Sequence, residues 1–244
     1  MFTVLGAVVV VLLAAVAVRV IFRDRFRSVP DQALPGTVLL VPGYGGNGGS
    51  LQQLADVIRA AGRTAVIVTL PDGGTGDLHR QADALDDAAR TALKTAVSVD
   101  VIGYSAGGVV ARLWVEEHDG KHKARRVVTL GSPQHGARIA AAGAAALPGA
   151  CPVACQQLAP GSQLLGSLSE SVPTPPQWMS VWTENDETVT PADSARLDGA
   201  TNVDIQQSCP GRQVSHGELP SDDYVTSLVL DAIGPGPIAT DASC

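Results

Sequence analysis

The sequence predicts an α/β fold in which helices cover both faces of a mostly parallel sheet, preceded by an N-terminal apolar helix. Short runs rich in β-branched residues alternate with longer stretches of helical periodicity, and turns containing Gly or Pro separate them. This alternation is typical of a parallel sheet built from strand–helix units. The chain has 244 residues, of which 45% are hydrophobic, so it can bury one sizeable core, and the even spread of the pattern favours one domain over two.

The N-terminal segment, residues 1–27, differs from the rest in composition. Residues 1–18 carry no charged side chain, and the apolar run continues to Phe22 if the Arg19 side chain reaches a membrane surface. We expect a signal peptide or membrane anchor here, followed by a linker over residues 28–36. An uncleaved anchor is favoured because no positive charge precedes the run, although Ala15-Val16-Ala17 is a cleavage-like pattern. The arginines that follow the run favour a cytoplasmic domain.

The main domain, residues 37–244, opens with three expected strands, each short, β-branched and bounded by turn residues. They cover residues 37–41, 65–70 and 98–102. A helix capped by Ser50 follows the first strand, and a helix over residues 78–96 capped by Asp77 follows the second. The third strand leads through Ser105 into a helix with four apolar residues on one face, Val109, Val110, Leu113 and Trp114.

The second half of the domain completes the sheet with strands over residues 126–132, 177–182 and 201–206, and a closing helix over 224–233. Residues 137–176 lie between these strands and are rich in Ala, Gly, Ser and Pro. Such a stretch is typical of a cap or lid excursion, although residues 137–147 could equally form an ordinary helix of the fold.

The pentapeptide Gly103-Tyr104-Ser105-Ala106-Gly107 has the spacing of a nucleophile elbow. The backbone of such a turn reverses so sharply that the residues two before and two after the serine must lack side chains, and Gly103 and Gly107 meet this demand. The alternative is a plain Gly-rich turn with an idle serine. The buried strand before the turn and the amphipathic helix after it favour Ser105 as the nucleophile.

A second glycine-rich turn follows the first strand, from Pro42 to Ser50, and leaves bare backbone amides at the carboxyl edge of the sheet. The amides of Tyr44 and Ala106 are therefore candidate donors of an oxyanion hole. A flexible loop or a nucleotide-phosphate loop is the alternative, but the spacing of a dinucleotide fingerprint is not convincingly met and no Gly-Lys-Ser/Thr follows.

A carboxylate that orients a catalytic histidine should follow a late strand, and Asp186 is our choice, with Glu184 and Glu187 as alternatives. Only one histidine, His216, comes after these acids, which gives the order Ser105, Asp186, His216. His135 is the rival base, but we expect it to line the pocket wall. Gly43, Tyr104 and His135 are expected to contact the substrate.

All four cysteines lie in the second half of the chain, and their even number on an exported chain suggests two disulfides. The simplest pairing joins Cys151 to Cys155 and Cys209 to Cys244. Zinc is the alternative, but this spacing, without a nearby histidine, is a poor metal pattern. Disulfides favour an extracytoplasmic location, either membrane-anchored or secreted, against the indication of the N-terminal arginines.

The net charge of −7 and the scarcity of basic residues oppose nucleic-acid binding. The basic run over residues 121–126 is expected to be a solvated loop.

Several motifs together resemble the lipases and esterases of the α/β-hydrolase fold, in particular the small bacterial class 2, or triacylglycerol lipase-like, enzymes. They are Val-Pro-Gly-Tyr-Gly-Gly at 41–46, Gly-Tyr-Ser-Ala-Gly-Gly at 103–108, Leu-Gly-Ser-Pro-Gln-His-Gly at 130–136, Asn-Asp-Glu-Thr-Val at 185–189, and His216. The resemblance implies Ser105 as nucleophile, His216 as base and Asp186 as its orienter. Pro42 departs from it, because these enzymes usually carry His there.

The resemblance implies hydrolysis of carboxylic esters of fatty acids, with a lipid or other ester as substrate and no metal or organic cofactor. A thioesterase or acyltransferase with the same three residues is one alternative. A membrane-anchored binding module that keeps the fold without turnover is another.

Overall fold

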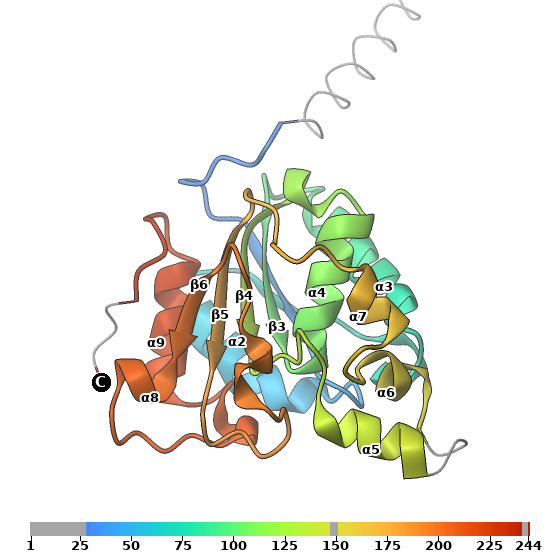
Figure 1. The fold of residues 1–244 in the computed structure, drawn as a ribbon. Coiled ribbons are helices and arrows are strands. Elements are labelled where there is room, and N and C mark those ends of the chain that lie inside the picture. The colour runs from blue at the N-terminus through green and yellow to red at the C-terminus, as the bar shows by residue number, and fades with distance from the viewer. Residues whose placement is uncertain (1–27, 147–150, 241–243) are drawn as a thin grey trace, which may run out of the picture.

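A computed structural model describes residues 28–146, 151–240 and 244 (Figure 1). Its centre is a six-stranded sheet in the order β2-β1-β3-β4-β5-β6, and every pair of neighbouring strands is parallel. The strands are β1 (Thr37–Val41), β2 (Ala65–Ile67), β3 (Val99–Tyr104), β4 (Ala124–Leu130), β5 (Gln177–Trp182) and β6 (Thr201–Asp204). The predicted α/β architecture is confirmed, whereas the predicted N-terminal apolar helix lies outside the described residues.

Helices cover both faces of the sheet, as expected (Figure 1). On one face lie α3 (Leu78–Ala92) and α4 (Ala106–Glu117), and on the other lie α2 (Gln52–Ala60) and α9 (Asp223–Ala232). The alternation of side chains along β1 feeds both interfaces, because Leu39 and Val41 belong to the core beneath α4 whereas Val38 and Leu40 belong to the core beneath α2. Parallel sheets buried on both faces need such continuous apolar strands.

The excursion predicted over residues 137–176 contains three short helices, α5 (Arg138–Ala146), α6 (Val153–Gln157) and α7 (Gln163–Ser167). The Cys151–Cys155 disulfide holds the start of α6, and the amide of Ala154 donates to the Thr75 carbonyl. The Gln157 side chain accepts from the first amide of α3. The excursion is thereby fastened to the loop that precedes α3.

The remaining elements are α8 (Ile205–Ser208) and five short 3₁₀ turns, η1 (Gly48–Leu51), η2 (Pro71–Gly74), η3 (Gly120–His122), η4 (Ala192–Ala195) and η5 (His216–Glu218). The Cys209–Cys244 disulfide joins the end of α8 to the C-terminal residue, so both expected cysteine pairs are present.

Two local predictions at the first helix and the second strand were wrong. Ser50 does not cap α2; it lies inside η1, whose N-cap is Asn47 with its side chain accepting from the Gly49 amide. The strand expected over residues 65–70 ends at Ile67, because β2 is an edge strand with Val66 exposed and the chain bends toward Pro71. The cap predicted at Asp77 is confirmed, since its side chain accepts from the His79 amide.

The basic run over residues 121–126 was predicted to be a solvated loop, but Arg125 and Arg126 are buried in β4. The guanidinium of Arg125 pairs with the fully buried carboxylate of Asp100 at 2.7 Å, and it also donates to carbonyls at the C-terminal end of α9. Arg126 donates to the Ala232 carbonyl of the same helix. These partners satisfy the buried charges and cap the last turn of α9.

Within the described part of the chain, no helix combines the length and the apolar composition needed to cross a bilayer. The anchor or signal peptide predicted for residues 1–27 lies outside that part.

Candidate active site

Ser105 lies at the junction of β3 and α4, in the conformation that the pentapeptide pattern predicts. Its φ of 52° and ψ of −127° are unusual for a residue with a side chain. A Cβ on Gly103 would come within 2.5 Å of the Gly107 carbonyl oxygen, and a Cβ on Gly107 would come within 2.2 Å of the Val41 carbonyl oxygen. Gly103 is therefore required by the turn that presents the Ser105 hydroxyl, and Gly107 by the close approach of the start of α4 to the end of β1.

The three residues predicted to act together are connected by hydrogen bonds. His216 Nε2 lies 3.1 Å from Ser105 Oγ, and His216 Nδ1 lies 2.7 Å from Asp186 Oδ2. The other carboxylate oxygen of Asp186 accepts from the amides of Thr188, at 2.9 Å, and Val189, at 2.7 Å. The residue that orients the imidazole is thus itself held by two backbone donors, and all three side chains are largely buried.

Tyr44, in the loop after β1, and Ala106, the first residue of α4, both line the pocket over Ser105. Gly43 lies directly beside the serine, because a Cβ there would be 3.0 Å from Ser105 Cβ. Neither the backbone amide of Tyr44 nor that of Ala106 donates to an acceptor within the described residues. The loop after β1 is held by a 3.3 Å bond from the Gly45 amide to the Gly74 carbonyl.

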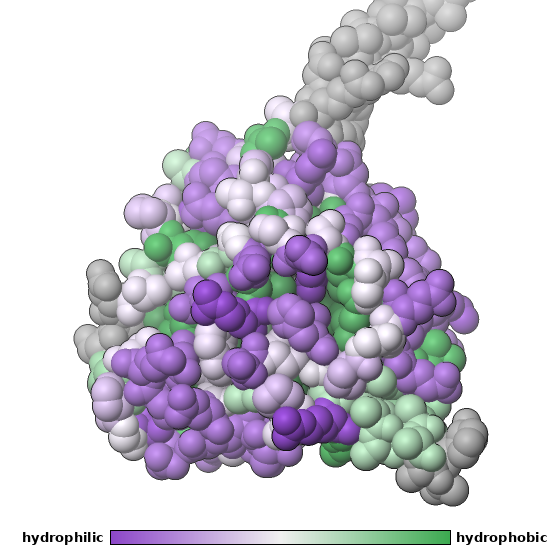
Figure 2. Space-filling view, in the orientation of Figure 1, coloured by the Kyte–Doolittle hydropathy of each residue, from purple (hydrophilic) through white to green (hydrophobic). Residues whose placement is uncertain are grey.

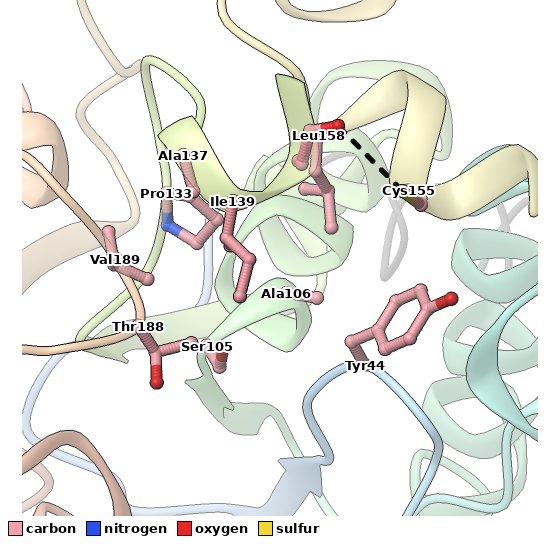
Figure 3. A pocket seen from close by; sticks show the side chains of 11 residues that line it. Tyr44, Ser105, Ala106, Pro133, Ala137, Ile139, Cys155, Leu158, Thr188 and Val189 are labelled. Atoms are coloured by element: carbon pink, nitrogen blue, oxygen red, sulfur yellow. Dashed lines mark hydrogen bonds between the residues drawn. The ribbon is translucent and has the colours of Figure 1, made fainter. Parts of the chain in front are cut away.

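A pocket of about 220 Å³ opens over Ser105 (Figure 3). Its wall is almost entirely apolar and is formed by loops at the carboxyl edge of the sheet, by the start of α4 and by the excursion. The lining residues are Tyr44, Ser105, Ala106, Pro133, Ala137, Ile139, Ala140, Cys155, Leu158, Thr188 and Val189. Ile139 and Leu158 point toward Ser105 and Ala106 from the excursion (Figure 3). The arrangement can hold an apolar group against the serine hydroxyl.

The disulfide of the excursion is part of this wall. Cys155 lines the pocket, and α5 packs against the sulfur atoms through Gly143, where a Cβ would lie 3.2 Å from the Cys155 sulfur.

Figure 2 shows hydrophobic residues gathered over α5 on a face that is otherwise mostly hydrophilic, and Ile139 is 62% exposed there.

The structure does not place His135 and Tyr104 where we expected them. His135 lines a separate pocket with Arg112 and Gln134, because its ring turns toward the Ser194 carbonyl. The Tyr104 side chain belongs to the core beneath α2 and α9, on the face of the sheet opposite α4. Its ring packs against that of His216 at 5.2 Å.

One residue at the site, Gly131, was missed in the sequence, and another, Glu187, was considered for a different role. Gly131, with φ of +54°, lies beneath the Asp186–His216 pair, and a Cβ there would be 3.2 Å from Asp186 Oδ2 and from His216 Nδ1. The glycine directly after a strand was a signal for such a close approach. Glu187, considered only as an alternative to Asp186, accepts instead from the His216 backbone amide at 3.1 Å.

The parallel sheet, the strained serine at its centre and the helices on both faces define an α/β-hydrolase fold. The family model of palmitoyl protein thioesterase matches residues 37–166, more than half of the chain, and the chain belongs to that family. The matched region contains Ser105 and ends before Asp186 and His216. No sequence among curated proteins matches this chain.

Solved structures with the same fold include Aspergillus fumigatus lipase B, at a TM-score of 0.72 and 18% identity over 84% of this chain and 54% of that one. This chain thus spans about half the length of that lipase. Bacillus licheniformis lipase BlEst2 in its mature form has a TM-score of 0.66 and 17% identity over 84% of this chain and 94% of that one. A third structure comes from work on LipS and LipT, two metagenome-derived lipolytic enzymes. It has a TM-score of 0.61 and 16% identity over 84% of this chain and 99% of that one. At these identities the likeness shows the fold alone.

Proposed function

We propose that the protein is a serine hydrolase that cleaves carboxylic esters through an acyl-enzyme on Ser105. The observation that carries the proposal is the hydrogen-bonded chain from Ser105 Oγ through the imidazole of His216 to Asp186. A serine hydroxyl alone is a weak nucleophile and needs an adjacent base that a third group orients. The resemblance to class 2 lipases, which is carried by these residues and by the motifs at 41–46 and 130–136, is part of this proposal.

In the first half of the reaction the Ser105 oxygen attacks the ester carbonyl and its proton passes to His216 Nε2. The electron pair of the carbonyl moves to its oxygen, which the amides of Tyr44 and Ala106 hold, each donor contributing about 10²- to 10³-fold in rate. The bond to the leaving alcohol then breaks as His216 Nε2 protonates it. Water attacks the acyl-enzyme by the same proton transfers and releases the acid.

The pocket supports an apolar acyl group as the part of the substrate that is bound. Its wall offers almost no hydrogen-bonding partner apart from Ser105, Thr188 and the rim residue Tyr44. Burying each methylene of an acyl chain there contributes about 0.8 kcal/mol. The proteins named as lipases or lipolytic enzymes that share this fold are consistent with such a substrate.

Thioester hydrolysis is a second candidate, because the chain belongs to the palmitoyl protein thioesterase family. The chemistry of the site is compatible with either leaving group, since His216 can protonate an alkoxide while a thiolate leaves with little help. Matched oxygen and sulfur esters with the same acyl chain separate the two. Added alcohol tests for acyl transfer in place of hydrolysis.

A fluorophosphonate probe tests the proposal directly. We expect labelling of the folded protein that is lost in Ser105→Ala, with loss of ester hydrolysis in the same variant. Ser132→Ala is a matched control, because Ser132 is a buried serine two residues beyond the end of β4. Absence of labelling in folded wild-type protein would favour a binding module that keeps the fold without turnover.

We also propose an extracytoplasmic location, with attachment to a membrane through residues 1–27 as one form of it. The two disulfides support this proposal, because such bonds persist in oxidising compartments. Mass spectrometry after alkylation without reductant, on protein from its native location, tests it. Four alkylated cysteines would refute it.

A further inference from the structure

His216 lies on a long connection between α8 and α9, outside the sheet. The bonds from Nδ1 to Asp186 and from Nε2 to Ser105 hold the ring only through its two nitrogens, so the position of the ring also depends on the backbone that carries it. Catalysis requires Nε2 to remain within hydrogen-bond distance of Ser105. Something must therefore hold the backbone from which the ring projects.

The backbone of His216 is held at both ends by side chains from elsewhere. Its amide donates to Glu187 Oε2 at 3.1 Å, and its carbonyl accepts from the Tyr104 hydroxyl at 3.2 Å as well as from the Leu219 amide at 3.3 Å. The Tyr104 ring also packs against the imidazole, with centroids 5.2 Å apart and planes tilted by 33°.

The two anchors are chain neighbours of the residues that contact the imidazole. Ser105 faces Nε2, and Tyr104 beside it holds the His216 carbonyl. Asp186 faces Nδ1, and Glu187 beside it holds the His216 amide. Each dipeptide thus fixes one ring nitrogen and one backbone group of the same residue.

We propose that Tyr104 and Glu187 are positioning residues that keep the His216 imidazole aligned between Ser105 and Asp186. The inference rests on the proposed function and extends it to two residues that need not touch the substrate. Burial, with the carboxylates of Asp186 and Glu187 nearby, raises the pKa of Tyr104 to about 12, so its hydroxyl keeps the proton that it donates to an even higher pH than an ordinary tyrosine. Glu187 acts here as a hydrogen-bond acceptor, which an uncharged amide side chain can replace.

The test compares Tyr104→Phe, Glu187→Ala, Glu187→Gln and the double variant Tyr104→Phe/Glu187→Ala in ester hydrolysis. A net hydrogen bond of this kind corresponds to about a 2- to 12-fold change, so we expect each single loss to lower kcat by roughly that factor. KM should stay unchanged, because neither side chain lines the pocket. Glu187→Gln should retain most of the activity, and the double variant should lose more than the product of the single losses.

Glu184→Ala is the matched control, because Glu184 is an exposed carboxylate on the same turn whose side chain has no bond to His216. The proposal is overturned if kcat of the double variant stays within twofold of wild type, or if Glu184→Ala lowers kcat as much as Glu187→Ala. A rise in KM without a fall in kcat would also overturn it.

Hydrogen exchange of the His216 amide gives a readout independent of turnover. We expect faster exchange in Glu187→Ala than in wild type or Glu184→Ala, and equal exchange would contradict the anchor. If wild type is not labelled at Ser105, the proposed function fails, while the exchange experiment still decides whether the backbone anchor exists.

Discussion

The substitution Asp186→Asn tests the role of the carboxylate more sharply than its removal. Asp186 Oδ1 accepts two backbone amides, from Thr188 and Val189, while Oδ2 faces His216 Nδ1. The asparagine must keep its oxygen toward the two amides, because turning its NH₂ group toward them would leave two buried donors unpaired, at about 1–3 kcal/mol each. Its NH₂ group therefore points at His216.

Facing a donor, Nδ1 of His216 must become the acceptor and the proton moves to Nε2. The imidazole then cannot take the Ser105 proton, although the geometry is intact. We expect kcat to fall by about 10⁴-fold, which corresponds to about 5.4 kcal/mol of lost transition-state stabilisation. Hydrolysis of a p-nitrophenyl ester measures it, with circular dichroism as the check on folding.

Glu184→Gln is the control for the carboxylates of this turn and should leave kcat within about twofold of wild type, as expected for a surface substitution. A loss below 100-fold in Asp186→Asn, or an equal loss in Glu184→Gln, would refute the assignment of Asp186 as the orienter.

Three further outcomes are expected. Gly131→Ala should lower kcat about tenfold with little change in KM, because its Cβ would lie 2.5 Å from Leu219 Cδ1 and 3.2 Å from Asp186 Oδ2 and His216 Nδ1, at a φ of +54° that disfavours a side chain, so that these groups must shift; unchanged kcat in steady-state kinetics would contradict this. Replacing Cys151 and Cys155 by Ser should destabilise the protein by about 2 kcal/mol and lower the melting temperature by roughly 4–8 °C, which calorimetry measures. Burial raises the pKa of the Asp86 carboxyl, but hydrogen bonds, chiefly from Lys123, bring it below its ordinary value. Its contribution to the free energy of unfolding is therefore present above about pH 4 and is lost as the pH falls through the folded pKa. Urea unfolding at pH 7 and at pH 3 measures this loss, which should be smaller in Lys123→Met than in wild type.

The alternation of strands and helices could be predicted because each element buries its own apolar face, and the spacing of apolar residues within the element shows that face. The elbow at Ser105 was equally local, since its glycines and flanking elements lie within one short stretch. The choice of Asp186 and His216 needed only chain order and the ends of strands. The structure brings both within hydrogen-bond distance of their expected neighbours.

The errors at the buried arginines and at Tyr104 and His135 arose because the partners of these residues are distant in sequence. Arg125 and Arg126 looked like a surface run because nothing nearby could neutralise them, whereas their partners are a carboxylate on β3 and carbonyls at the end of α9. Tyr104 and His135 were expected to face the substrate because they neighbour site residues. Their orientation depends on which face of the sheet each side chain takes and on the packing of η4.

The buried arginines also hold the linker that precedes the main domain. Arg125 donates to the Gln32 carbonyl at 3.0 Å, which holds the chain before β1 at the amino ends of the strands, whereas the pocket opens at their carboxyl ends beside α5 (Figure 1). The amino ends of the strands therefore hold the preceding chain, and the carboxyl ends form the pocket. A resin, label or fusion partner joined ahead of Gln32 should leave the entrance above Ser105 unobstructed.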